Sequence, residues 1–442
     1  MSRELPVPEG THVLSNKNRI TSIISACAGN LVELYDFFIY SYTAIYFASL
    51  FFPDGNQTTQ LMASAGIFGY IADNKGRKVA MVVSVFLMCG GSLLIAVMPV
   101  YSSIGVAAPA LLLVARLMQG LSVGAEYGTG ATYISEISRK GTRCFFGSFQ
   151  YMTIIAGQLL ALLTISLLQL LLTAEQMHAW GWRIPFLIGA FSALAVVYVR
   201  RHMAETLVAK KSAHTKAGTL RELMKYPRAI TVTLFITMGC SLYFYTFTSY
   251  MQKYLVLSVG MSPESAGLIM TSALVLFMVV QPLFGALADR IGSRTSMIIF
   301  GVLATLFVIP LMTLLRGATD VWSALLLVAA GLLIASFYTP ITGVLKADLF
   351  PAGIRALGVS LPYAVGNALC GGTAEYVALW TRSQGIESNY FIYVAVMTCL
   401  SLIAALLLPN LQKHGWLDGD GKVEDLTQIR SRKPALISDS QN

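Results

Sequence analysis

The chain has 442 residues, of which 55% are hydrophobic and only 12% are charged, and its mean hydropathy is +0.66. A soluble domain carries about 25% charged residues, so this composition excludes a water-exposed surface over most of the chain and predicts a membrane protein. The net charge of +9 raises nucleic-acid binding as an alternative, which the positions of the charges exclude below. Six cysteines without C-x-x-C spacing lie in or beside apolar stretches and are interpreted as packing residues.

Long apolar stretches follow a polar segment at residues 1–19. In the first half of the chain they cover residues 20–50, 61–71, 79–98, 106–125, 144–172 and 184–199, and in the second half residues 229–251, 266–288, 295–315, 322–345, 356–379 and 390–408. Most reach the ~20 residues that a helix needs to cross a bilayer, and helix is the conformation that satisfies the backbone in hydrocarbon. The stretch at 61–71 would span only about 16 Å, so we expect a shortened second span.

The stretches predict an all-α fold with six spans in each half. The halves are residues 20–199 and 229–408, and the charged segment 200–228 is expected to link them. Residues 409–442 balance cations against acids and are expected to form a flexible tail.

Two loop motifs recur, one in each half of the chain. Gly69, Asp73 and Gly76 reappear 216 positions later as Gly285, Asp289 and Gly292. A second set, Glu136, Gly141, Arg143, Ser148 and Tyr151, reappears 212 positions later as Asp348, Gly353, Arg355, Ser360 and Tyr363. Internal repeats in an apolar chain are typical of secondary transporters.

The distribution of Lys and Arg predicts the orientation in the membrane. The loops at 73–78, 136–143, 200–228, 289–294 and 346–355 carry 18 cations, whereas the alternate loops carry four. By the positive-inside rule the first set of loops and both termini lie in the cytoplasm, and a bacterial inner membrane is expected. The basic excess then faces lipid headgroups and the cytoplasm, so the lipid bilayer is the expected partner and nucleic acid is not.

Charged residues inside the spans are the first candidates for function, because each costs about 2.5–3.5 kcal/mol or more at the membrane centre. They are Glu33, Asp36, Arg116, Glu126 and Glu375. Arg116 lies near the middle of its span and suits an anionic substrate. Glu33 and Asp36 are three residues apart and share a helical face; Asp36 is the first choice for a proton carrier, Glu33 the second, and Glu126 and Glu375 complete the set. The alternative is a structural ion pair between Arg116 and one acid.

Uncharged polar groups at mid-span depth are the next candidates. Gln158, Tyr243, Tyr245 and Tyr338 are expected to contact substrate, with plain packing as the alternative. None of the five histidines falls in a span, and metal-ligand spacing, a phosphate-binding glycine loop and a catalytic constellation are all lacking. We therefore expect that the protein is not an enzyme and binds no metal or cofactor. A proton gradient is the expected energy source.

The repeated loops are candidates for gating. A carboxylate at Asp73 or Asp289 is placed to accept hydrogen bonds from helix N-terminal amides and to pair with Arg77 or Arg294. We expect a charge cluster that clamps the halves together on the cytoplasmic side; the alternative is that these charges only set topology and cap helices. The expected gating residues are Gly69, Asp73, Gly76, Arg77, Lys78, Glu136, Arg143, Asp289, Arg294, Asp348 and Arg355.

The first loop motif, together with Arg116-Leu117-Met118-Gln119-Gly120, resembles the major facilitator superfamily. The stretches at 29–37 and 181–186 narrow the resemblance to its metabolite:proton symporter family, and those at 158–163, 245–254, 336–339, 345–347 and 374–379 are similar to members that carry α-ketoglutarate. This resemblance implies two six-helix halves that take up α-ketoglutarate or a similar dicarboxylate with protons by alternating access. It also implies a gating role for the first loop motif and a proton-linked role for Arg116; a monomer is expected.

The sequence departs from that family in two places. Leu34 stands where the family usually has Trp, and between Phe68 and Gly69 the family carries further residues, including an intramembrane arginine, that are absent here. Two alternatives stay open. One is a symporter of the same family for citrate, shikimate or a zwitterionic osmolyte, and the other is a transport-defective copy or sensor with a shortened second span.

Overall fold

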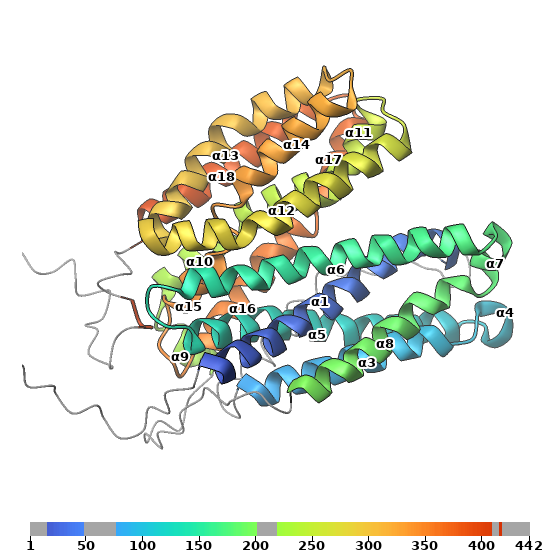
Figure 1. Ribbon diagram of the computed structural model, residues 1–442, viewed down its shortest axis with the longest axis horizontal. Coiled ribbons are helices and arrows are strands. Elements are labelled where there is room, and N and C mark those ends of the chain that lie inside the picture. The colour runs from blue at the N-terminus through green and yellow to red at the C-terminus, as the bar shows by residue number, and fades with distance from the viewer. Residues whose placement is uncertain (1–15, 48–76, 201–218, 409–414, 418–442) are drawn as a thin grey trace, which may run out of the picture.

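The computed structural model describes residues 16–47, 77–200, 219–408 and 415–417, and the regular structure within them is entirely helical. The helices form two bundles that meet at one end and diverge at the other (Figure 1). The expected short span at 61–71 lies outside the described residues, as do Gly69, Asp73 and Gly76. Arg77 and Lys78 begin a helix, but their side chains also lie outside the description, so the gating roles of all five stay predictions.

The N-terminal bundle is built from α1 (Asn16–Phe47), α3 (Arg77–Val97), α4 (Tyr101–Ile104), α5 (Ala107–Ile137), α6 (Arg143–Leu171), α7 (Ala174–Ala179), η2 (Gly181–Arg183) and α8 (Ile184–Arg200). The C-terminal bundle follows the short helix α9 (Leu220–Leu223). It contains α10 (Pro227–Tyr245), η3 (Thr246–Tyr250), α11 (Met251–Leu257), α12 (Pro263–Ile291), α13 (Ser293–Arg316), α14 (Val321–Ala335), α15 (Thr342–Ala347), α16 (Arg355–Gly366), η4 (Asn367–Gly371), α17 (Ala374–Ser383) and α18 (Glu387–Leu406).

Eight spans in the described part of the chain are long and apolar enough to cross a membrane, and two shorter apolar helices accompany them. Their outer faces carry many large exposed apolar side chains, which lipid rather than water would cover. The prediction of an all-α, multi-pass membrane protein is therefore confirmed.

Several helix boundaries differ from those expected. Helix α5 runs to Ile137 rather than ending near residue 125, and α8 includes Arg200, which the sequence pattern assigns to the linker. Arg200 is fully buried and pairs with the buried carboxylate of Glu126. The hydropathy pattern predicted neither feature, because the sequence alone does not distinguish a polar residue that packs against another helix from one that lies outside the membrane.

Two of the spans expected in the C-terminal half are interrupted, and a third changes its helical pitch. A non-helical turn at residues 336–341 separates α14 from α15. π-Helical turns occur at η3, after α10, and at η4, after α16. Such irregular turns are tolerated at membrane depth where they are covered by protein or line a cavity, and they are frequent at functional sites.

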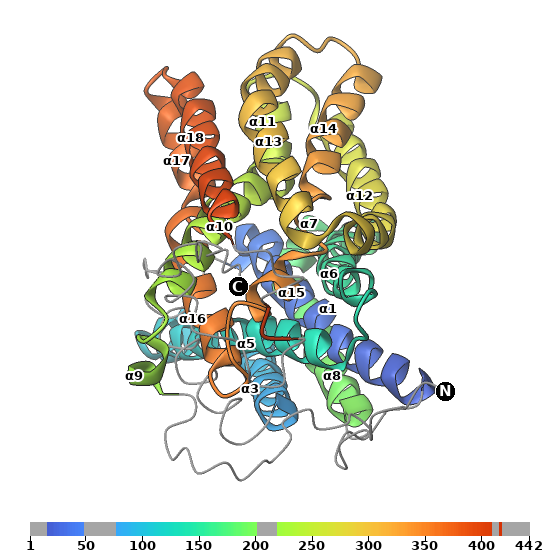
Figure 2. The same cartoon turned by 90° about the vertical axis from the view of Figure 1, so that its left-hand side faces the viewer.

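The two bundles approach most closely through α12 and α6 and through α16, α15 and α5. Figure 2, which looks at the closed end, shows α15 and α16 lying across α5 between the two groups of helices. Glycine permits one of these contacts: a Cβ at Gly285 would lie 2.6 Å from the backbone oxygen of Cys144. This close crossing brings the end of α12 directly over the first turn of α6.

Candidate functional site

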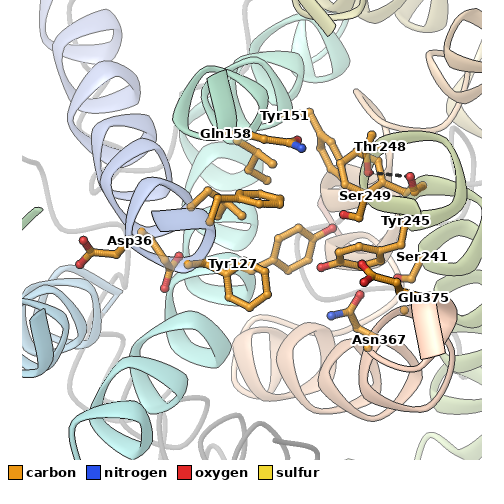
Figure 3. Close-up of a pocket in the computed structure, with 18 of the residues that line it drawn as sticks. Asp36, Tyr127, Tyr151, Gln158, Ser241, Tyr245, Thr248, Ser249, Asn367 and Glu375 are labelled. Carbon is orange, nitrogen blue, oxygen red and sulfur yellow. Dashed lines mark hydrogen bonds between the residues drawn. The ribbon is translucent and has the colours of Figure 1, made fainter. Parts of the chain in front are cut away.

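A cavity of about 730 Å³ lies between the two bundles. Its wall includes residues of α1, α5 and α6 from the first half and of α10, α11, α16 and α17 from the second. It reaches Leu257 and Pro263, at the end where the bundles diverge in Figure 1. Figure 3 shows Asp36 and Gln158 on one side of the cavity and Tyr245, Asn367 and Glu375 on the other. The cavity is therefore built by both halves and reaches the end where the described helices of the two bundles diverge.

A chain of polar contacts lines the first half's wall and joins Arg116 to Asp36. The Arg116 Nη1 donates to Oε1 of Gln119 at 2.9 Å, and the Gln119 Nε2 donates to Oγ of Ser92 at 2.9 Å. The Ser92 hydroxyl donates in turn to Asp36. The Arg116 guanidinium carbon also lies 3.7 Å from the ring centroid of Tyr40. A direct structural ion pair between Arg116 and an acid, the alternative interpretation, is not found among the described residues.

Asp36 is buried, and its carboxylate points away from the cavity centre in Figure 3, toward α3, which carries Ser92. One of its oxygens has no hydrogen-bond partner. An unsatisfied buried carboxylate oxygen is costly, and a proton bound there would remove the buried negative charge. Hydrogen bonds through Gln119 and Ser92 thus connect Asp36 to Arg116.

Glu33 and Glu126, the other acids of the first half, have different environments. Glu33 lines the cavity, is 2% exposed and accepts a long 3.4 Å hydrogen bond from Ser122. Glu126 does not line the cavity; it pairs with Arg200 and accepts a 2.8 Å hydrogen bond from Ser84. This buried ion pair favours a structural role for Glu126, and its proton-carrier role stays a prediction.

The second half's wall is polar where α10 passes into η3. Tyr245, Thr248 and Ser249 line the cavity there, and Asn367 of η4 lies on the same side. Glu375 lies nearer the open mouth, where it pairs with Lys253 and keeps 39% of its side-chain surface exposed. The predicted proton-coupling role of Glu375 required a buried side chain, and the Glu375 side chain is not buried here.

The remaining expected substrate contacts divide into two groups. Gln158 lines the cavity and its amide projects into it (Figure 3). Tyr338 lines the cavity too, but its hydroxyl donates to the backbone oxygen of Cys240 at 3.0 Å. Tyr243 is not a lining residue; its hydroxyl donates to the backbone oxygen of Gly331 at 3.1 Å. In this conformation α10 turns the Tyr243 side chain into the bundle core and away from the cavity, and its substrate contact stays a prediction.

Two tyrosines that sequence reasoning did not assign to the site form the cavity floor. Tyr127 from α5 and Tyr363 from α16 stack with ring centroids 3.7 Å apart and an interplanar angle of 13°, and both line the cavity. Tyr363 belongs to the repeated loop set as the counterpart of Tyr151, which also lines the cavity. The repeat was thus the one sequence signal that pointed to this floor.

Below the floor, the repeated motifs hold the two bundles together. The Asp289 carboxylate at the end of α12 accepts backbone N–H bonds from Cys144 at 2.9 Å and Phe145 at 2.8 Å. These amides belong to the first turn of α6, in the other half. The expected pair between Asp289 and Arg294 is wrong, since Arg294 donates to the backbone oxygen of Leu406. Gly292, with φ of 92°, ends α12 in a conformation that favours glycine.

A cross-half ion pair accompanies this helix cap. Arg355 of α16 donates to Glu136 of α5 at 2.9 Å, and the two side chains are only 6% and 12% exposed. Asp348 and Arg143, the other members of the expected cluster, meet at the tail: the Leu417 backbone N–H donates to Asp348, and Arg143 donates to the Leu417 oxygen. At least residues 415–417 of the tail are therefore docked on the cluster, contrary to a wholly flexible tail.

Comparison with known proteins places this geometry in a family. The family described as Major Facilitator Superfamily matches residues 48–361 and again residues 234–437. The chain belongs to this superfamily. It is 50% identical over 406 residues to the alpha-ketoglutarate permease of Escherichia coli (strain K12), covering 89% of this chain and 94% of that protein. It is 32% identical over 429 residues to the inner membrane metabolite transport protein YhjE of the same strain, covering 91% of this chain and 96% of that protein.

Solved structures show the same major facilitator fold. The proton:xylose symporter XylE bound to 6-bromo-6-deoxy-D-glucose superposes with a TM-score of 0.75 at 16% identity, covering 90% of this chain and 99% of that one. The major facilitator transporter FucP in the outward conformation gives 0.63 at 14% identity, covering 88% of this chain and 99% of that one. The chain is therefore a major facilitator transporter and not an enzyme.

Proposed function

We propose that this protein takes up α-ketoglutarate, or a similar dicarboxylate, together with protons by alternating access. The observation that carries the proposal is the cavity between the halves, in which the Arg116 guanidinium is linked through Gln119 and Ser92 to buried Asp36. A cation in a cavity of low polarity attracts a carboxylate strongly. The 50% identity to an alpha-ketoglutarate permease supports this choice of substrate.

In this proposal the protein is a monomer in a bacterial inner membrane, with the cation-rich loops and both termini in the cytoplasm. The cap at Asp289 and the pair of Glu136 with Arg355 then close the cytoplasmic side. The cavity is approached from the opposite side, so this conformation faces outward.

Transport then follows from the order of contacts. A proton neutralises Asp36, and a substrate carboxylate approaches Arg116, while Gln158, Tyr245 and Asn367 offer hydrogen bonds from the facing walls. Binding brings the outer ends of the bundles together, and the contacts between α5, α6, α12 and α16 separate. Glu33, which lines the cavity beside this path, is the second candidate for the proton site.

The direct test is uptake of labelled α-ketoglutarate by proteoliposomes under an imposed pH gradient. We expect accumulation that collapses with a protonophore and is competed by unlabelled dicarboxylates. Arg116→Ala is expected to abolish uptake while the protein still inserts, whereas Arg290→Ala, an exposed cation at the end of α12, is expected to leave it unchanged. Competition by citrate, shikimate or a zwitterion in place of dicarboxylates would select another substrate. Failure of the parent protein to transport any of these would favour the transport-defective alternative.

A further inference from the structure

Lys346 in α15 lies inside the protein rather than in a solvated loop. The sequence pattern places it among the loop cations, but it is only 1% exposed. Its ammonium lies 4.7 Å from the ring centroid of Tyr363 and 5.5 Å from that of Tyr127. These are the two stacked rings that form the cavity floor, so a second cation lies directly against the floor.

Within the described part of the chain, Lys346 has no ion-pair partner. An unpaired ammonium buried away from water costs several kcal/mol, and contact with aromatic faces returns only about 2 kcal/mol. A well-packed apolar side chain of similar length would be more stable in this position. The lone cation is therefore better explained by a ligand that reaches it in another conformation.

Polar groups without partners surround the same place. Thr342 lies four residues before Lys346 in α15, on the same helical face, and its buried hydroxyl has no hydrogen-bond partner. The Tyr127 hydroxyl is also buried and without a partner. One ammonium and two neighbouring hydroxyls are the donors that a carboxylate requires.

The spacing along α5 separates this place from Arg116. Arg116 and Tyr127 are eleven residues apart in one helix, which corresponds to about 16 Å at 1.5 Å per residue. The terminal carboxyl carbons of a five-carbon dicarboxylate are at most about 5–6 Å apart, given C–C bonds of about 1.5 Å. The positions of Arg116 and Tyr127 along α5 are therefore farther apart than one substrate molecule is long, and in this inference the two cations act in sequence.

We infer that Lys346, with the hydroxyls of Tyr127 and Thr342, is an inner carboxylate-binding subsite that the Tyr127–Tyr363 stack seals in this conformation. This inference rests on the proposed function. When the cation-rich face opens, α5 and α16 separate, the two rings part and the ammonium is uncovered. The substrate then passes from Arg116 to Lys346 before release, and a substrate that enters from the cation-rich side meets Lys346 first.

The test compares the two faces of the membrane. Labelled α-ketoglutarate transport is measured in right-side-out and inside-out membrane vesicles for the parent, Lys346→Met and Lys346→Arg. Loss of one charge-assisted contact corresponds to a change of about tenfold or more in affinity. Lys346→Met is expected to raise the KM by this factor from the cation-rich side and by less than about twofold from the other, and Lys346→Arg is expected to restore most of the difference. Lys225→Met, an exposed cation on the same face, is the matched control and should change neither KM.

A merely structural role for Lys346 would give a different result. Removal of an unpaired buried charge is expected to leave the melting temperature of the detergent-solubilised protein unchanged or higher. A Lys346→Met variant that melts earlier and loses transport equally from both faces would overturn the subsite, as would unchanged KM values from both faces. A parent protein that does not transport α-ketoglutarate would instead refute the proposed function, so the two failures are distinguishable.

Discussion

The helix cap at Asp289 allows a quantitative prediction about the balance between outward-facing and inward-facing states. Its two carboxylate oxygens accept the N–H groups of Cys144 and Phe145, which belong to the other half. Asp289→Asn keeps one acceptor, replaces the other with a donor that faces an N–H, and removes the negative charge at the start of α6. A hydrogen bond to a charged group contributes about 1.5–3 kcal/mol. Because Asp289 is half-buried, we take about 2 kcal/mol, which corresponds to a shift of about 30-fold toward the inward-facing state.

The assay measures how fast a membrane-impermeant maleimide labels Ser249→Cys, a half-buried position in the cavity wall. Asp289→Asn is expected to slow labelling from the open side of the cavity in proportion to the lost outward-facing population. Asp320→Asn is the matched control, since Asp320 also caps a helix through the Ser323 N–H at 2.9 Å but within one half. That hydrogen bond lowers the pKa of Asp320, so the Asp320 carboxyl is charged at neutral pH. Equal labelling rates in the parent, Asp289→Asn and Asp320→Asn would refute the reasoning.

Three further predictions concern acidic side chains. Asp36→Asn is expected to abolish proton-driven accumulation of substrate while counterflow exchange continues. Glu33→Gln is the comparison variant. If Asp36→Asn accumulated substrate as the parent does, Asp36 would be excluded as the proton carrier. Glu126→Gln leaves Arg200 buried and without its carboxylate partner, which costs about 3–5 kcal/mol. The melting temperature of the protein in detergent should therefore fall by several degrees. Adding Arg200→Met to the Glu126→Gln chain should restore the melting temperature. Failure of that second substitution to rescue would show that Arg200 is stabilised by other contacts. Glu375→Gln, at the exposed mouth, should change the KM less than about threefold in the same uptake assay; loss of transport would return Glu375 to the candidate proton carriers.

The contacts between the halves on the closed side show what the repeated sequence motifs could and could not predict. The repeated residues correctly indicated a charged cluster at one membrane face, and Glu136 does meet Arg355 there. The partners within the cluster were not predictable, because Asp289 caps a helix of the other half and not its own loop. A repeat identifies equivalent positions, whereas a contact between halves depends on how the two copies pack.

The sequence by itself determined the membrane class and the duplicated helical architecture, and it predicted Arg116 and Asp36 as site residues, because hydropathy and the cost of a buried charge are properties of the residues alone. Only the tertiary structure decided which face of each helix is inside. It placed Arg200 against Glu126, turned Tyr243 into a bundle core and buried Lys346 beneath two tyrosines. The sequence of one helix does not specify these contacts, because each contact depends on which neighbouring helix the side chain packs against.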